Sequence, residues 1–83
     1  MASTEIESWV VDTCRELGLL VEGVGDDFFL AGGNSLTAVR LIAKVEERFG
    51  EDCLPPDDLF ERSGVGQIAE TILANRERSQ VPD

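Results

Sequence analysis

Hydrophobic positions recur with helical spacing near the N-terminus. In the segment TEIESWVVDTCREL, residues 4–17, inward-facing side chains return every three or four residues. At about 100° per residue they share one helix face, which carries Ile6, Trp9, Val10, Thr13, Cys14 and Leu17. Thr4 is the expected N-cap with Glu7 as its reciprocal partner, and Gly18 is the expected stop. On this face we expect Cys14 to be a buried hydrophobic residue and not a reactive thiol.

A long connection follows in residues 18–34. It contains five glycines, yet it also holds large apolar residues, namely Leu19, Leu20, Val21, Val24, Phe28, Phe29 and Leu30. A flexible linker would not carry so many apolar groups, so we expect this loop to pack its own side chains against the helices. Loops of this length inside compact domains usually have a function.

The second half of the chain predicts three more helical segments. One runs from Ser35 to Phe49 and ends at Gly50. The segment LPPDDLFERSG is short and Pro-rich, so we expect a single turn opened by Pro56, with Leu59 and Phe60 facing the core. The last helix covers residues 65–76, where the buried stripe consists of Val65, Ile68, Ala69, Ile72 and Leu73.

No segment has the pattern of a strand, and the tail from about Arg76 is expected to fray. The prediction is therefore a single all-α domain over residues 1–83, ordered over about 4–75. Its architecture would be a small four-helix bundle with a long first loop and a short third helix.

Composition and charge exclude several classes of protein. The net charge is −10, from 17 acidic and 7 basic residues, which disfavours nucleic acid and anionic lipid as partners. No apolar run approaches the roughly 20 residues of a membrane span, and the N-terminus does not resemble a secretion signal. We therefore expect a cytoplasmic protein. Its two cysteines, with no histidine, are expected to be free thiols and to bind no metal.

A helical wheel of residues 35–49 separates two faces. Ala38, Leu41, Ile42, Val45 and Phe49 cluster on the core face, whereas Leu36 falls about 160° away and should be exposed beside Ser35. Arg40, Ala43, Lys44 and Glu47 share its side. An exposed leucine with a polar rim is typical of a transient docking patch, and Arg40, Lys44 and Arg48 form a basic row that fits either a solvated face or recognition.

Ser35, in the run GGNSL, has three interpretations. As a nucleophile it would need a base, but there is no histidine, Asp26 and Asp27 are weak bases, and the second glycine of a nucleophile elbow is missing. As an N-cap it would be a common choice, although this explains neither the double glycine nor Leu36. As a substrate, a phosphate ester at this helix N-terminus would be stabilised, and Gly32 and Gly33 would let another enzyme approach. The third interpretation explains most.

At these residues the chain resembles the acyl and peptidyl carrier superfamily. An acid and a Phe-Phe pair at Asp27-Phe28-Phe29, followed by Gly32-Gly33-Asn34-Ser35-Leu36, match the family pattern. The segments RLIAKVEERFG, LPPDDLFE and VGQIAETI resemble its second, third and fourth helices in order and spacing. The resemblance covers roughly residues 5–75.

The resemblance implies that Ser35 accepts 4′-phosphopantetheine from coenzyme A and that cargo is carried on the arm as a thioester. It places Gly33, Asn34 and Leu36 around the arm, and partner enzymes on a face of helix 35–49 formed by Leu36, Val39, Arg40, Ala43 and Lys44. It implies a non-catalytic carrier whose partners are a phosphopantetheinyl transferase and the adenylation, condensation or tailoring enzymes of nonribosomal peptide assembly. Since no second apolar face remains once the core is assigned, we expect a monomer.

The chain departs from the family pattern in three ways. Asn34 stands where His or Asp is usual, Ala31 replaces a leucine and should thin the packing of the loop, and Gly64 and Gly66 should let the last helix start late or loosely. The double glycine and the basic row favour peptidyl over acyl cargo. Acyl cargo of a polyketide or fatty-acid type, and an acidic interaction module in which Ser35 is only a cap, are the alternatives. From its Met start and its end soon after the last helix, we expect a free-standing chain.

Overall fold

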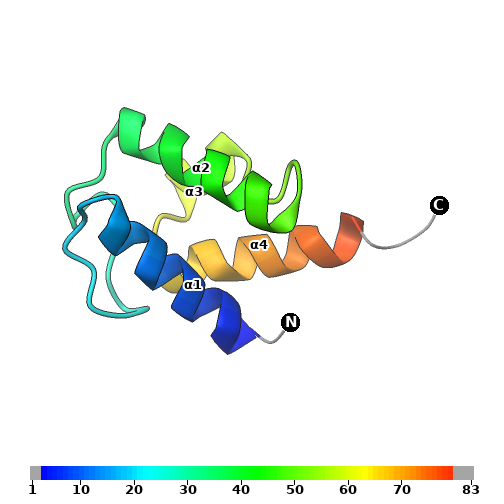
Figure 1. Ribbon diagram of the computed structural model, residues 1–83, viewed down its shortest axis with the longest axis horizontal. Coiled ribbons are helices and arrows are strands. Elements are labelled where there is room, and N and C mark those ends of the chain that lie inside the picture. The colour runs from blue at the N-terminus through cyan, green and yellow to red at the C-terminus, as the bar shows by residue number, and fades with distance from the viewer. Residues whose placement is uncertain (1–2, 80–83) are drawn as a thin grey trace.

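The computed structural model describes residues 3–79, which form four helices and no strand (Figure 1). The helices are α1 (Ser3–Glu16), α2 (Ser35–Phe49), α3 (Pro56–Glu61) and α4 (Val65–Ser79). A long loop joins α1 to α2, and α3 is a short turn of helix between α2 and α4. The predicted all-α bundle, with its long first loop and short third helix, is confirmed.

Helix α1 packs mainly against α4 through the face that the sequence predicts. Ile6, Val10, Thr13 and Cys14 are buried there, and Trp9 and Leu17 are partly buried. The helix already includes Ser3, so Thr4 lies inside its first turn and the predicted N-cap at Thr4 is wrong. The predicted stop is confirmed, because Gly18 has φ +89° and the N–H of Leu19 donates to the Cys14 carbonyl at 3.0 Å, as in a Schellman motif.

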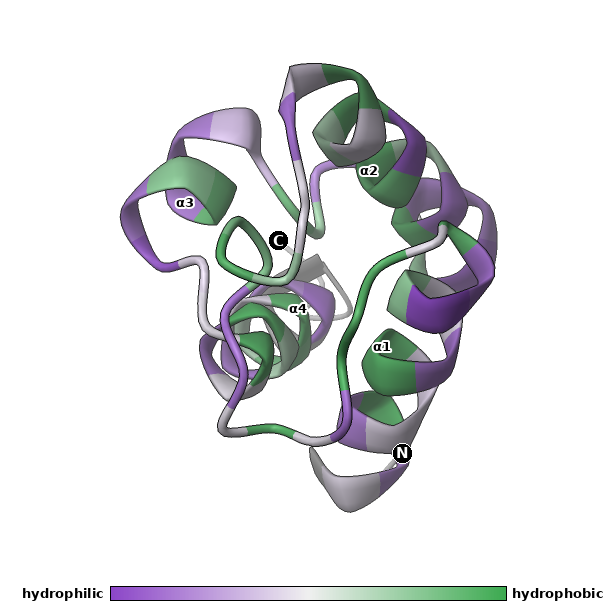
Figure 2. Cartoon of the chain, turned by 90° about the vertical axis from the view of Figure 1, so that its left-hand side faces the viewer, coloured by the Kyte–Doolittle hydropathy of each residue, from purple (hydrophilic) through white to green (hydrophobic). Residues whose placement is uncertain are grey.

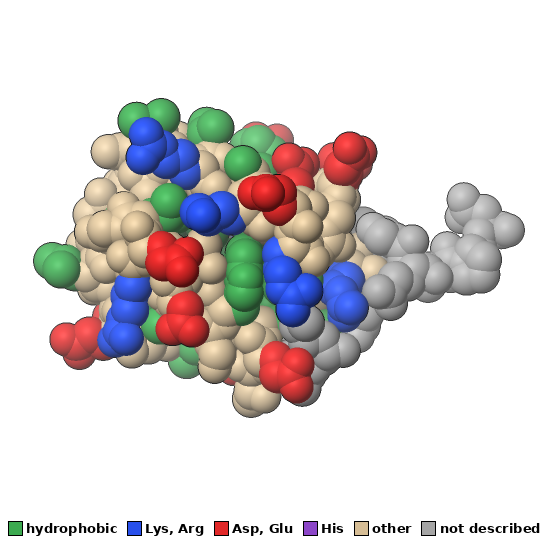
Figure 3. Space-filling model, in the orientation of Figure 1, with side chains coloured by type: hydrophobic (Ala, Val, Ile, Leu, Met, Phe, Trp, Pro, Cys, Tyr) green, Lys and Arg blue, Asp and Glu red, His purple; other side chains and the backbone are tan. Residues whose placement is uncertain are grey.

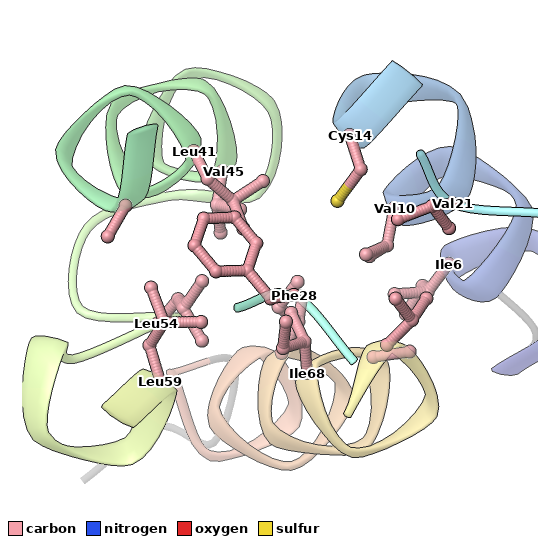
Figure 4. Close-up of a cluster of buried hydrophobic side chains, with 14 of the residues drawn as sticks. Ile6, Val10, Cys14, Val21, Phe28, Leu41, Val45, Leu54, Leu59 and Ile68 are labelled. Atoms are coloured by element: carbon pink, nitrogen blue, oxygen red, sulfur yellow. The ribbon is translucent and has the colours of Figure 1, made fainter. Parts of the chain in front are cut away.

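The centre of the core is a side chain from the first loop. Phe28 is fully buried and lies between α2 and α4 (Figure 4). Leu19 and Val21 of the same loop are also buried, but Leu20 and Leu30 point into solvent. The loop therefore packs against the helices as expected, with only part of its apolar side chains.

Helix α3 confirms one half of its prediction and corrects the other. Pro56 opens it and Leu59 is fully buried. Phe60 does not face the core: it is 51% exposed, and its ring stacks on Phe29 with centroids 5.4 Å apart. Consecutive residues on a helix point about 100° apart, and the inward side of this six-residue helix is narrow, so it takes in Leu59 and leaves Phe60 at its edge.

Helix α4 buries Val65, Ile68, Ala69 and Ile72, as predicted, with Leu73 partly buried. It begins at Val65, so the expected late start is wrong. The side chain of Gln67 stabilises this start by accepting the Gly64 N–H at 3.1 Å. The helix continues to Ser79, beyond the predicted start of the tail at Arg76; residues 80–83 of that predicted tail lie outside the described residues.

Both cysteines are buried free thiols, as expected. Burial raises the pKa of Cys14 from 9.0 to about 11, so its reactive thiolate is scarce at neutral pH. None of the helices in residues 3–79 combines the length and the apolar character that crossing a membrane requires.

Candidate functional site

Ser35 is the first residue of α2, and it lies at the end of the molecule where the first loop meets that helix (Figure 1). The residue is exposed. Within residues 3–79 its hydroxyl makes no hydrogen bond. The serine oxygen is therefore accessible and is not used to hold the fold together.

The N-cap of α2 is Asn34, one residue before the serine. Its backbone is extended (φ −144°, ψ −176°), and its Oδ1 accepts hydrogen bonds from the backbone N–H and the hydroxyl of Thr37, each at 3.0 Å. The interpretation of Ser35 as the helix cap is therefore wrong. Because Asn34 does the capping, Ser35 is left free for chemistry.

The two glycines before the serine are required by the fold itself. A Cβ on Gly33 would lie 2.5 Å from the Phe28 ring and 2.6 Å from the Phe28 carbonyl oxygen, to which the Gly33 N–H donates at 3.0 Å. Gly32 has φ +111°, a conformation that side chains rarely adopt. The sequence predicts that the pair gives a partner room at the serine. That remains a prediction; the structure shows a role within the fold, because Gly33 lets the chain pass closely over Phe28 and Gly32 provides the positive φ.

A set of hydrogen bonds fastens the loop to the junction between α3 and α4. The Ser63 hydroxyl donates to Asp27 Oδ2 at 2.7 Å, and the Phe28 N–H donates to the Ser63 carbonyl at 2.8 Å. The Val65 N–H donates to the Asp26 carbonyl at 2.8 Å, and Asp27 and Gly64 form an isolated bridge. We call this set the Asp27–Ser63 clasp. It fixes Phe28, and Phe28 in turn fixes the backbone that leads into Ser35.

Electrostatics at the start of α2 favour an anion. The backbone N–H groups of Ser35 and Leu36 have no acceptor on the described chain, and the first turn contains no acidic residue. No acidic residue occurs in α2 before Glu46, while Arg40 and Lys44 contribute positive charge. Free N–H groups and the positive end of the helix dipole stabilise a phosphate at such a position.

The exposed face of α2 agrees with the helical wheel. Leu36 is 62% and Val39 is 63% exposed, Arg40 and Ala43 are exposed, and Lys44 is half-buried. We call these five residues the α2 patch. Figure 3 shows apolar and basic side chains gathered over the N-terminal half of α2, with acidic side chains toward its C-terminal end. The patch next to Ser35 is therefore apolar and basic on a strongly acidic chain.

These observations fit a covalently attached phosphate ester better than catalysis by the chain itself. The hydroxyl is exposed and the helix terminus accommodates an anion. The sequence contains no histidine that could take the proton from the serine hydroxyl. Hydrogen bonds from Ser63 and from the N–H groups of Leu30 and Phe29 lower the pKa of Asp27, which makes that carboxylate an even weaker base. Within residues 3–79 no three acidic or thiol side chains lie close enough together to hold a metal ion.

Sequence reasoning missed the Asp27–Ser63 clasp and the cap at Asn34. The cap had a local signal, because Asn is among the residues most preferred at a helix N-cap. The clasp joins residues 36 positions apart in the sequence, and nothing in the local pattern of either segment predicts such a contact.

Comparison with known proteins adds an independent finding. Residues 11–72 match the family model described as phosphopantetheine attachment site. A linear gramicidin synthase of Brevibacillus parabrevis is 48% identical over 58 residues, which cover 68% of this chain and 1% of that protein. Phosphinothricin tripeptide synthetase PhsC of Streptomyces viridochromogenes is 42% identical over 60 residues, covering 72% and 5%. Surfactin synthase subunit 2 of Bacillus subtilis is 34% identical over 77 residues, covering 93% and 2%. The chain thus spans 5% or less of the length of these relatives.

Proposed function

Because this chain belongs to the phosphopantetheine-attachment family, we propose that it is a carrier protein for aminoacyl and peptidyl intermediates in nonribosomal peptide biosynthesis. Its cofactor is a covalently attached 4′-phosphopantetheine. When bound, this group supplies a terminal thiol that carries cargo as a thioester, which stays reactive because a thiol with a pKa near 8.5 leaves readily. The proposed attachment point is Ser35.

The observation that carries this proposal is that Asn34, and not Ser35, caps α2. Asn34 caps α2 through Thr37, whereas the Ser35 hydroxyl is exposed and makes no hydrogen bond on the described chain. A serine at the first helical position, with free N–H groups beside it, is suited to carry a phosphodiester. Gly33, Asn34 and Leu36 are its immediate neighbours and are proposed to lie against the arm.

In this proposal the chain is a substrate of partner enzymes and catalyses no step. The transferase that attaches the arm would supply the base and the metal, which the exposed environment of Ser35 does not. The proposed partners are a phosphopantetheinyl transferase and the adenylation, condensation or tailoring enzymes that load and use the cargo. They would dock on the α2 patch, where Leu36, Val39 and Ala43 provide apolar contact beside Arg40 and Lys44.

We further propose a monomer located in the cytoplasm. Coenzyme A and reducing conditions are found there, and reducing conditions keep thiols free; both Cys14 and Cys53 are free thiols. The exposed apolar residues of the α2 patch are few and have basic neighbours, which is typical of transient docking rather than of a permanent dimer.

Intact-mass spectrometry tests the attachment. The protein is incubated with coenzyme A and a broad-specificity phosphopantetheinyl transferase, and its mass should rise by one phosphopantetheine group. Ser35→Ala should show no rise, whereas Ser8→Ala, which replaces an exposed serine on α1, should be modified like the wild type. A wild-type mass that does not rise, or a Ser35→Ala mass that does, contradicts the proposal.

A loading assay tests the class of cargo. The arm-bearing protein is offered to an amino-acid-activating enzyme and, separately, to malonyl and fatty acyl donors with their transferases. We expect aminoacyl loading. Loading by malonyl or fatty acyl donors alone would assign the chain to polyketide or fatty-acid chemistry instead.

A further inference from the structure

A hollow of about 230 Å³ lies at the loop end of the molecule, and no step of the proposed function uses it. It is lined by Leu20, Gly25, Asp26, Asp27, Leu30 and Ala31, and we call it the loop hollow. Its two leucines are 85% and 90% exposed, the highest values among the exposed large apolar residues. Figure 2 shows their two loop segments side by side at the near end of the molecule, and the Leu20 N–H donates to the Ala31 carbonyl at 3.0 Å.

The floor of the loop hollow is negatively charged. The Asp26 carboxylate accepts the N–H of Glu22 at 2.7 Å and that of Gly23 at 3.1 Å, which lowers its pKa. Asp27 is held by the clasp. Neither carboxylate forms an ion pair with any residue in 3–79. The hollow therefore offers two apolar walls next to two fixed charges without a counter-charge, which complements a group that is both apolar and cationic.

The loop hollow is within reach of a group attached to Ser35. Ala31, on its wall, precedes Ser35 by four residues, so their Cα atoms lie at most roughly 15 Å apart. A phosphopantetheine arm contains about fourteen bonds between the serine oxygen and the sulfur and extends to roughly 16 Å, judged by the advance per bond of a polypeptide. The end of the arm can therefore be placed at the hollow without any movement of the helices.

We propose that the loop hollow is a resting site for an apolar α-aminoacyl group carried on the arm at Ser35. The aliphatic or aromatic side chain of the cargo lies between Leu20 and Leu30, and its α-ammonium group faces Asp26 and Asp27. This inference rests on the proposed function, because it requires the arm. It adds a preference for aminoacyl cargo over acyl cargo that resides in the carrier itself.

Because the cargo is covalently attached to the chain, even a shallow site can hold it. The hollow is smaller than the roughly 300–1,000 Å³ pockets that bind free small molecules, and its size suits a single side chain. A group on a short flexible linker is present at an effective concentration in the millimolar range, so weak contacts give a substantial bound population. A second groove, between α1 and α2, carries both signs of charge and lacks this complementarity to a cation; it is lined by Trp9, Thr13, Glu16, Lys44, Glu47 and Arg48.

Methyl NMR tests the proposal on the intact chain. Two coenzyme A derivatives are transferred to Ser35 by a broad-specificity transferase: one carries leucine, the other carries 4-methylpentanoate, each through an amide bond that does not hydrolyse. The two cargoes differ only in the amino group. The leucyl form should shift the methyl signals of Leu20 and Leu30 relative to the unloaded arm. An exposed ion pair should make the shifts about twofold to fivefold larger for leucyl than for 4-methylpentanoyl cargo.

Variants distinguish contacts of the cargo with the loop hollow from contacts elsewhere on the surface. Leu30→Ser should abolish the shift at Leu20, whereas Ala74→Ser, which replaces an exposed apolar residue of α4, should leave it. Asp26→Asn keeps an acceptor for the two N–H groups but removes one of the two charges, so it should bring the leucyl shift closer to the 4-methylpentanoyl level, as should high salt.

The outcomes that overturn the proposal are distinct from those that overturn the proposed function. If no arm can be attached to Ser35, the proposed function fails. If the arm is attached but Leu20 and Leu30 do not shift, or shift equally for both cargoes, the resting site is wrong and the carrier function is untouched. Shifts at Leu20 and Leu30 that appear only after a partner enzyme is added would assign the hollow to protein docking and would also overturn the resting site.

Discussion

Asn34 Oδ1 lies 3.0 Å from both the backbone nitrogen and the hydroxyl of Thr37, and this contact starts α2 without the help of Ser35. In most helices a serine near the start would itself be a candidate for the cap. Here the cap is one residue earlier, so the fold does not use the serine at the position where we propose that the cofactor is attached.

Substitutions of Asn34 and of Ser35 should therefore differ in their effect on the free energy of unfolding. Asn34→Ala removes the acceptor for Thr37 and should lower the free energy of unfolding by about 1 kcal/mol. Asn34→Asp keeps the acceptor and should be close to wild type. Ser35→Ala should change stability by less than about 0.5 kcal/mol. Urea denaturation followed by circular dichroism gives all three values, and a Ser35→Ala cost equal to that of Asn34→Ala would contradict the assignment.

A side chain at Gly33 should destabilise the fold, whether or not a partner approaches this residue. A Cβ there would meet Phe28 at 2.5 Å, so Gly33→Ala should destabilise the fold by about 1–3 kcal/mol through overpacking. Gly25→Ala is the matched control, because nothing lies within 4 Å of a Cβ at that position. Thermal unfolding of the two variants distinguishes them. Equal melting temperatures would mean that Phe28 moves aside freely.

The Asp27–Ser63 clasp should make the free energy of unfolding depend on pH. The folded-state pKa of Asp27 is lowered, chiefly by the Ser63 hydroxyl. Its stabilisation is therefore present above the unfolded value of about 3.9 and is lost as the pH falls through the lower folded value. Ser63→Ala should cost more stability near pH 7 than near pH 2.5, whereas Ser8→Ala should show no such difference. A Ser63→Ala effect that does not vary with pH would exclude this linkage.

The α2 patch predicts a variant that folds normally but is loaded poorly by partner enzymes. Leu36 is 62% exposed, so Leu36→Asp should leave the circular dichroism spectrum and melting temperature unchanged while weakening enzyme-dependent loading of the arm. Leu41→Asp, on the buried face of the same helix, should abolish cooperative unfolding. If Leu36→Asp unfolds the chain, the orientation of α2 is wrong; if its loading equals that of the wild type, partners do not dock there.

The helices could be predicted from the sequence because each has a periodic apolar stripe that survives in the fold. Residues such as Leu41 and Ile68 are buried where a period of 3.6 places them. The start of α2 at Ser35 and its end before Gly50 also agree with the prediction. Phe60 departs from it because a helix of six residues is too short for its pattern to determine which side faces inward.

The loop could be predicted only in outline. Its apolar content indicates packing, but an irregular backbone has no period, so nothing in the sequence separates buried Phe28 from exposed Leu30. The role of Gly33 depends on contact with Phe28, and that of Asp27 on Ser63, which reaches it from another part of the chain. The motif is enough to propose Ser35 as the attachment point. The structure adds why its hydroxyl is free, because Asn34 caps α2.

The most direct test of the central claim is to locate the modification within the chain. After treatment with coenzyme A and a phosphopantetheinyl transferase, the protein is digested and its peptides are fragmented by tandem mass spectrometry. We expect one modified peptide, with the phosphopantetheine on Ser35, and none on the exposed Ser8 or the half-buried Ser63. A phosphopantetheine group found on any residue other than Ser35, or on none, would contradict the account.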